Sequence, residues 1–282
     1  MAIRARRVFI ALALPPVVTT YAIHRTLSSL ESRYPELPVT SSTCSAALRT
    51  PESPSTQRCD GVDIYATQVP LSTLLAPRTT SPDNKPAATR SIAAAWAHAV
   101  IGSRILRLEG SLFGLVTRGK FHPGDVGDSP AGFAPRPEPD GGERECKREL
   151  LNGVLVVERP PAPGDPYGLL TSWRMDRGAC EFFETIARWG YPWRLVSGGR
   201  HEMSVSGPLE MEGRRREEEE EEEEEGPFVE VRFASAHDYV VVPEEGERQK
   251  TIPGWVGRLH RGYARLILHL AVRELQQQPV SG

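Results

Sequence analysis

The sequence predicts an α+β fold, in which a curved antiparallel sheet packs on a long C-terminal amphipathic helix after an N-terminal hydrophobic segment. Three observations support this prediction. Apolar residues recur at helical spacing near the C-terminus, several short segments before it alternate as strands do, and an uncharged apolar run lies near the N-terminus. We divide the chain into an anchor or targeting segment (1–30), a disordered tether (31–60) and one domain (61–282).

The N-terminal segment has three arginines followed by sixteen uncharged residues, 8–23, with Pro15 and Pro16 in the middle. As a helix this run spans about 24 Å, against about 30 Å for the hydrocarbon core of a bilayer. We expect a single-span membrane anchor with the arginines on the cytoplasmic side. A mitochondrial presequence is the main alternative, because the first acidic residue is Glu31. A cleaved secretory signal is the third.

The tether is rich in Ser, Thr and Pro, a composition typical of flexible chain. Two of the four cysteines, Cys44 and Cys59, fall in it. A disulfide between them in an oxidising compartment and free thiols in a reducing one both remain open. No CxxC pair occurs, so neither a zinc ribbon nor a thioredoxin site is predicted.

The first half of the domain is predicted to contain a short strand and a turn over 61–75 and an Ala-rich helix over 91–103. Residues 104–117 alternate around Leu106 and Leu108, which indicates a strand. Gly110 and Gly114 are interpreted as bends in it. The following stretch, 122–145, has five prolines and five glycines and is expected to be a disordered insertion.

The second half is predicted to be rich in strands, at 153–157, 168–174, 193–197, 200–206 and 228–242. A short helix over 178–189 has an apolar face made of Phe182, Phe183, Ile186 and Trp189. Nine consecutive glutamates, 217–225, lie between the last two strands, so 207–226 is expected to be a disordered insertion in a hairpin loop. We interpret the run as a solvated low-complexity expansion rather than as an acidic interaction tail.

The last predicted element is a helix of about 253–277 that begins with Pro253. Its apolar residues at helical spacing are Val256, Leu259, Tyr263, Leu266, Ile267 and Leu270. Arg258, Arg261 and Arg265 form an opposing basic stripe, which we interpret as a solvated face rather than a membrane contact.

The order of these elements resembles the helix-grip architecture of the START-like and Bet v 1-like superfamily. It also resembles an uncharacterised plant and bacterial family of START-like character, through Trp96, GRHEMSV at 199–205, VEVRFASAHDY at 229–239 and the Arg-rich terminal helix. The TLPGH element of that family has no counterpart here. The resemblance implies a fold and no activity, since that family has none established. The chain is also similar in style to uncharacterised filamentous-fungal proteins.

Alternation along two strands predicts the candidate site. In 200–206, Met203 and Val205 should face the core and His201 with them, while the other face carries Arg200, Glu202 and Ser204. In 228–242, an apolar row of Val229, Val231 and Phe233 continues as Ser235, His237 and Tyr239. If both rows line one cavity, its polar end is formed by His201, Ser235, His237 and Tyr239. The alternative is that these are ordinary core residues with backbone partners.

Known catalytic and cofactor motifs are absent from the sequence. His201 and His237 are each followed by an acid, but neighbours on a strand point to opposite faces, so neither pair is a catalytic dyad. The HExxH pattern fails at Val205, and no GxSxG, P-loop or GxGxxG motif occurs. We therefore predict no metal and no cofactor. Three tryptophans, Trp173, Trp189 and Trp193, are candidates to stack on a ring or sugar, although core packing is their commoner use.

The composition limits the partners. Charged residues are 25% and hydrophobic residues 39% of the 282, as in globular rather than polytopic membrane proteins. Outside the glutamate run, 28 acids face 34 bases, which favours anionic surfaces but is far from the charge density of a nucleic-acid-binding protein. We expect a membrane-tethered domain that binds an apolar or lipid-like molecule. The alternatives are a cyclase-like or hydrolase-like enzyme that uses His201 or His237 as general base, and a ligand-free scaffold.

Overall fold

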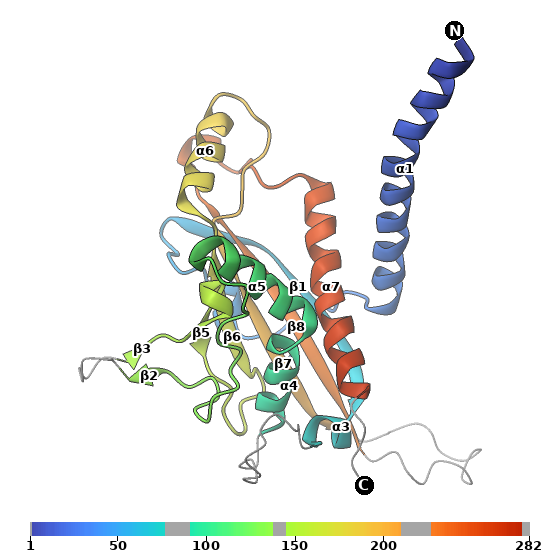
Figure 1. The fold of residues 1–282 in the computed structure, drawn as a ribbon. Helices are drawn as coiled ribbons and strands as arrows, with labels where there is room; N and C mark the ends of the chain where they lie inside the picture. The colour runs from blue at the N-terminus through green and yellow to red at the C-terminus, as the bar shows by residue number, and fades with distance from the viewer. Residues whose placement is uncertain (1, 77–90, 138–144, 210–226, 278–282) are drawn as a thin grey trace.

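The computed structural model describes residues 2–76, 91–137, 145–209 and 227–277 (Figure 1). Its α-helices are α1 (Ala2–Arg33), α2 (Ala46–Arg49), α3 (Leu71–Leu75), α4 (Ile92–Ile101), α5 (Arg104–Arg118), α6 (Arg177–Arg188) and α7 (Gly254–Gln276). Its strands are β1 (Gln57–Pro70), β2 (Arg136–Pro137), β3 (Glu145–Cys146), β4 (Glu149–Leu150), β5 (Leu155–Arg159), β6 (Leu169–Arg174), β7 (Gly198–Leu209) and β8 (Phe228–Val240). Two short 3₁₀ helices are η1 (Leu151–Gly153) and η2 (Pro243–Glu245).

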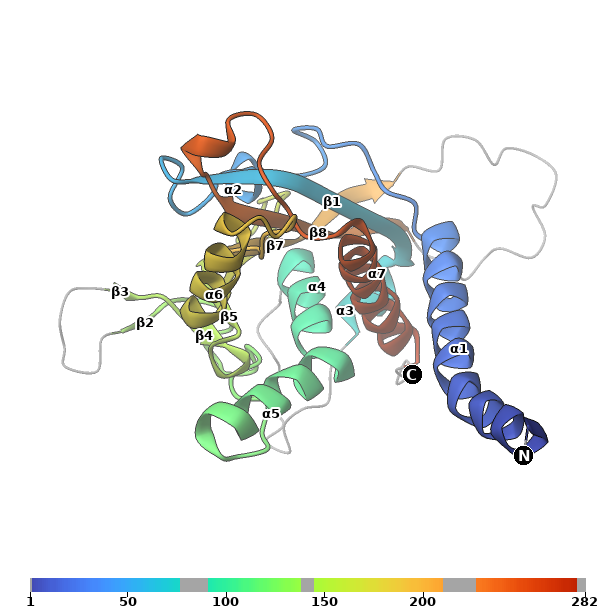
Figure 2. The same ribbon diagram turned by 90° about the horizontal axis from the view of Figure 1, so that it is seen from above.

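The main sheet has six antiparallel strands in the order β1-β8-β7-β6-β5-β4. It curves around α4 and α7, which lie together on one face (Figure 2). The predicted fold class, a curved antiparallel sheet on a C-terminal helix, is confirmed. We call the face toward α4 and α7 the helix side and the opposite face the outer side.

The helix side holds the main core. Alternate residues of β7 and β8 pack there against the Ala-rich α4 and the middle of α7, because period-two alternation puts every second side chain on this face. The buried members include Trp96, Val100, Met203, Val205, Val229, Val231, Phe233, Ile267, Leu268 and Ala271. The indole Nε1 of Trp96 donates a hydrogen bond to the Arg232 carbonyl at 2.9 Å. The only side-chain donor of Trp96, the largest fully buried residue, is therefore satisfied.

The outer side is covered by residues 34–57, which were predicted to be part of a disordered tether. That prediction is wrong. Cys44 and Leu48 are buried and form a second core with residues of three strands. Tyr34, at the start of the segment, is buried in the main core, where its hydroxyl is hydrogen-bonded to His269 of α7. Both Cys44 and Cys59 are free thiols. A few apolar anchors order a segment whose average composition resembles flexible chain, because burial is decided by individual side chains.

Charged residues on the outer side are buried in pairs. Arg200, Glu202 and Ser204 share the outer side as predicted, but the covering segment keeps them from solvent. The guanidinium of Arg200 donates to both carboxylate oxygens of Asp238, at 2.6 and 2.7 Å, and to the Leu48 carbonyl at 2.7 Å. Glu202 accepts from the Ser45 backbone N–H at 3.0 Å, from the Ser45 hydroxyl, and from Arg159 at 3.0 Å. Each buried charge therefore has a partner, as burial of a charge requires.

Residues 104–117 form helix α5 and not the predicted strand. The apparent alternation misled because Leu106 is buried whereas Leu108 is exposed. The two glycines taken as bends lie on the buried side of the helix. A Cβ on Gly110 would meet the Pro123 carbonyl at 2.8 Å, and one on Gly114 would meet the His122 carbonyl at 2.9 Å. These glycines permit close approach of the next segment.

Part of the stretch predicted as a disordered insertion, 122–145, lies in the described chain and is packed. Val126 and Phe133 are buried, and the Asp125 carboxylate accepts two hydrogen bonds from the buried Arg148, both at 2.9 Å. The second predicted insertion, 207–226, lies almost wholly outside the described residues.

Helix α7 begins and ends close to the predicted bounds, but its basic stripe is not a uniformly solvated face. Arg265 is buried, donates to the Tyr34 carbonyl at 2.9 Å and lies over the Tyr65 ring at 4.1 Å. Arg258 pairs with Glu31 at 2.8 Å, which holds the end of α1 beside α7. Leu259, predicted on the apolar face, is exposed instead. Within the described residues, no helix combines the length and apolarity needed to cross a membrane.

Gly110→Ala tests the packing beneath α5. Alanine stabilises most helix interiors relative to glycine, but here the clash with the Pro123 carbonyl should dominate. We expect the free energy of unfolding to fall by roughly 1–3 kcal/mol, measured by urea denaturation. The matched control is Gly254→Ala, where nothing lies within 4 Å of the new Cβ. Equal stability of the two variants would contradict the packing described.

Candidate functional site

Strand pairing brings three of the four predicted site residues together. His201 on β7 lies directly opposite Ser235 on β8, and His237 lies opposite Gly199 two pairs further along. All three face the helix side, as the alternation predicted. Tyr239 continues the same row, but it is buried and its hydroxyl accepts from the Ile252 N–H at 3.4 Å. Tyr239 therefore packs under the chain leading into α7 and is not part of the same group.

Trp173 and His260 complete the group, which we call the histidine cluster: Trp173, His201, Ser235, His237 and His260. The Trp173 ring lies 6.2, 6.5 and 6.4 Å from the rings of His201, His237 and His260, centroid to centroid. His237 and His260 lie 4.3 Å apart, edge to face. All four ring residues are partly exposed, unlike the apolar core further along the same strands.

Gly199 explains how a tryptophan fits against the sheet at this point. A Cβ at Gly199 would meet Cζ2 of the Trp173 indole at 2.8 Å, so the ring occupies the place of the missing side chain. Gly199 pairs with both Trp173 and His237 in the sheet. The Gly-Gly pair at the start of β7 therefore serves aromatic packing as well as entry into the strand.

Four buried polar atoms of the cluster have no protein partner, and four further such atoms are scattered elsewhere in the described chain. Among the described residues, no hydrogen bond is made by the buried Nδ1 of His201, Nε2 of His237, Oγ of Ser235 or Nε1 of Trp173. Buried polar groups normally find partners, and leaving one without costs about 1–3 kcal/mol. Four such atoms in one group indicate that another molecule, either water or a ligand, completes them.

The histidines are neutral at physiological pH. Burial lowers the pKa of His201 to about 3, helped by the nearby imidazoles of His260 and His237. Burial also lowers the pKa of His237 to about 3, with His260 and Arg261 acting in the same direction. The pKa of His260 is lowered by burial and by Arg261. A neutral imidazole offers one donor and one acceptor, so the cluster is polar without being charged.

One carboxyl lies at the border of the cluster. Asp63 on β1 pairs with Ser235 in the sheet and is oriented to the helix side. Burial, together with the negative charge of Glu36, raises the pKa of Asp63 to about 6. No hydrogen bond links Asp63 to Ser235 or to a cluster histidine in the part of the chain that the structure describes. A Ser–His–Asp relay, which needs the histidine bonded to both partners, is therefore not assembled.

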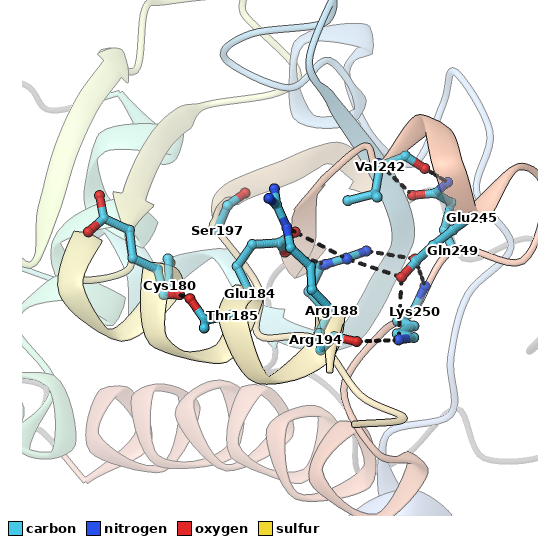
Figure 3. A network of polar contacts seen from close by, with 12 residues as sticks. Cys180, Glu184, Thr185, Arg188, Arg194, Ser197, Val242, Glu245, Gln249 and Lys250 are labelled. Atoms are coloured by element: carbon cyan, nitrogen blue, oxygen red, sulfur yellow. Dashed lines mark hydrogen bonds and ion pairs between the residues drawn. The ribbon is translucent and has the colours of Figure 1, made fainter. Parts of the chain in front are cut away.

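A network around Arg194 holds the chain at this end of the sheet (Figure 3). The segment 193–197, predicted as a strand, is irregular, and its buried Arg194 bonds Glu184 of α6 at 2.7 Å and Glu245 of η2 at 2.8 Å. Lys250 donates to the Ala187 carbonyl at 2.7 Å. Since residues 243–253 lead into α7, this network helps to fix where α7 begins and hence where His260 lies.

A separate hollow lies toward the outer side of the sheet. It has a volume of about 540 Å³ and is lined largely by charged residues, with Trp173 and Gly199 at its border with the histidine cluster. The charged residues include Arg174, Arg200, Glu52, Glu158 and Asp238. These groups are paired with one another or with neighbours: Arg174 with Glu52, Arg200 with Asp238, and Glu158 with Ser172 and Lys147. We place the candidate site at the histidine cluster because it gathers four buried polar atoms without protein partners, whereas the charged groups that line this hollow are paired.

Sequence analysis missed His260 and Asp63 as neighbours of the predicted residues. For His260 a signal existed, since it lies four residues after Val256 and three before Tyr263, on the apolar stripe of the helix. Trp173 was singled out for possible stacking, without a location. Trp189, which was considered with it, is exposed at the end of α6. Phe182, within α6, is exposed as well. The apolar face predicted for that helix is therefore largely open to solvent.

Comparisons with known proteins add no identity. No protein-family model, no curated protein and no solved structure matches the chain. Within the described residues, no group of three or more His, Cys, Asp or Glu side chains is arranged to hold a metal ion.

The lowered histidine pKa values predict a pH-dependent stability. His201 and His237 have folded-state pKa values of about 3, below the unfolded value of about 6.5. The unfolded chain thus binds more protons in this window, so their contribution is complete above pH 6.5 and is lost as pH falls toward 3. We expect a slope of up to about 1.4 kcal/mol per pH unit for each histidine.

Urea denaturation between pH 6.5 and 4 measures this slope. His201→Gln and His237→Gln should each flatten the dependence, and the double variant should flatten it most. Thr67→Val, a change of similar size on the same sheet without an ionisable group, should leave the slope as in the unmodified chain. A double variant with the full slope would show that the histidines are not held neutral by the fold.

Proposed function

We propose that the domain binds a small amphipathic molecule, apolar or lipid-like over most of its length, at the histidine cluster. The observation that supports this proposal is the set of four buried hydrogen-bonding atoms without partners, on His201, His237, Ser235 and Trp173. Apolar side chains lie next to them, since the Phe233 ring is 5.3 Å from that of His201. A polar end beside an apolar wall is the usual design of a site for such ligands.

The chemistry of the polar group follows from the charge of the cluster. Because His201 and His237 are neutral above pH 4, they offer hydrogen bonds but no positive charge. The imidazoles therefore suit a hydroxyl, carbonyl or amide, whereas a desolvated carboxylate or phosphate would also have to reach the cationic Arg261 near His237 and His260. The ligand is therefore proposed to carry a neutral polar group.

The enzyme alternative, with His201 or His237 as general base, is less well supported. General base catalysis is most efficient when the pKa of the base lies near the working pH. A pKa of about 3 is far below it, and the imidazoles have no carboxylate partner among the described residues. A ligand-free scaffold is the remaining alternative, in which ordered water completes the cluster.

We also propose that residues 1–30 attach the protein to a membrane, with a mitochondrial location as the alternative. The support is the uncharged apolar run 8–23 after three arginines. Resistance of the full-length protein to alkaline carbonate extraction would favour a span. Release by carbonate would contradict a span and favour surface attachment. Removal of the first residues in isolated mitochondria would instead identify a presequence.

Ligand binding is tested on the full-length chain, because residues 34–57 are part of the fold. We expect native mass spectrometry of protein released from detergent to show one retained molecule per chain, identified after organic extraction. His201→Leu and His237→Leu should each lower its occupancy, with affinity weakened roughly 3- to 10-fold per hydrogen bond lost.

The control is His122→Leu, which removes an exposed histidine outside the cluster. A well-folded chain with no bound molecule, also after incubation with its own lipid extract, would count against the binding proposal and favour the scaffold. Equal occupancy in all three variants would place the ligand elsewhere, with the charged hollow on the outer side as the first region to test.

A further inference from the structure

Helix α5 has the opposite arrangement to a typical surface helix of a soluble domain, because it buries small residues and exposes large apolar ones. Its buried positions are mostly small, Gly110, Ser111 and Gly114, together with Leu106. Ile105 also packs against the core, but the other large apolar side chains of the helix point to solvent. We call four of them the α5 stripe: Leu108, Leu112, Leu115 and Val116, which are 51, 50, 48 and 84% exposed. Phe113 on the helix and Phe121 just after it are also exposed, at 41 and 61%. Several large apolar side chains exposed together mark a contact surface.

Basic residues border this stripe. At about 100° per residue, Arg104 lies about 20° from Leu115 at one edge of the stripe, and Arg118 and Arg107 lie about 40° and 60° further round the helix on that side. All three are exposed, and none forms an ion pair within the described part of the chain. The helix has a single acid, Glu109, whose carboxylate accepts a hydrogen bond from the Tyr263 hydroxyl at 2.6 Å. An apolar stripe with an unpaired basic border is the pattern of helices that lie in a membrane interface.

The position of α5 in the fold is compatible with contact to a flat surface. Seen from above, α5 is the outermost element on the helix side of the domain, and the N-terminal end of α1 points toward that same side (Figure 2). The stripe points to solvent, whereas the histidine cluster lies between the sheet and α7. The hydrogen bond from Tyr263 to Glu109 joins α5 to α7 about one turn after His260.

We propose that the α5 stripe lies on the surface of a lipid bilayer with anionic headgroups, with the bordering arginines against the phosphates. A second copy of this chain is a poorer occupant. A two-fold contact through the stripe would bring the unpaired arginines of both copies together, and α5 has no free acid to oppose them. Phospholipid supplies both the apolar layer and the negative charge.

The experiment uses a local reporter, because the apolar N-terminal run can hold the whole chain on vesicles by itself. Full-length Val116→Cys and Thr117→Cys, each with Cys146→Ser to remove an exposed thiol, are labelled with an environment-sensitive NBD fluorophore. Thr117 follows Val116 on the helix but points about 100° away from the stripe. The Cys146→Ser chain without an added cysteine measures labelling of the other thiols.

With phosphatidylcholine vesicles that contain phosphatidylserine, we expect the emission at position 116 to shift to the blue and that at position 117 to change little. Arg104→Gln with Arg107→Gln should raise the vesicle concentration needed for half of this shift roughly tenfold or more. Leu112→Glu should weaken it similarly, and circular dichroism should show that these exposed substitutions keep the fold.

Two results would overturn the proposal. The first is an unshifted label at 116 on protein that co-sediments with the vesicles, which would mean that the N-terminal run alone makes the contact. The second is a blue-shifted label at 116 before vesicles are added. If that shift grows with protein concentration, the stripe is a contact between copies, and if it does not, another segment of this chain covers it.

Discussion

The buried ion pair between Arg200 and Asp238 determines how the outer side of the sheet is closed. Two charges removed from water are tolerable only when they are fully paired, since an unpaired partner costs several kcal/mol. The fork of Arg200 meets both oxygens of Asp238 across neighbouring strands, and its Nε donates to the Leu48 carbonyl. The chain before β1 must therefore return over the sheet, where Glu202 binds the start of α2 through Ser45.

The two faces of the sheet satisfy their polar groups in different ways. On the outer side, charges are matched by charges, so that this face is complete within the protein. On the helix side, the neutral histidine cluster leaves atoms without partners at the end where α7 begins. This contrast, rather than the size of any hollow, separates a structural polar region from a region suited to recognise another molecule. The same alternation of side chains produces both, because His201 and Glu202 are neighbours in sequence.

The parts of the fold and site that were predicted correctly from the sequence follow from the two-residue periodicity of strands. In β7 and β8 it placed His201, Ser235 and His237 on one face, which needs only the two-residue repeat of a strand. It failed where local pattern and tertiary structure disagree. The stripe of α5 faces solvent, so the helix lacked the usual signal of large residues turned inward. The cover over 34–57 depends on Cys44 and Leu48, which are too few to alter a Ser/Pro-rich composition, and the burial of Arg265 depends on Tyr34 and Tyr65, which are remote in sequence.

The connection between β7 and β8 allows the net charge of the protein to change without a change in the fold. Pairing of the two strands ends at Leu209 and resumes at Phe228, and the nine glutamates lie between these residues. The entropy of closing such a connection grows only with the logarithm of its length, about 0.6 kcal/mol per doubling. A repeat of one amino acid can therefore lengthen or shorten over generations with little thermodynamic penalty. Each step changes the isoelectric point of the protein while every residue of the sheet keeps its neighbour.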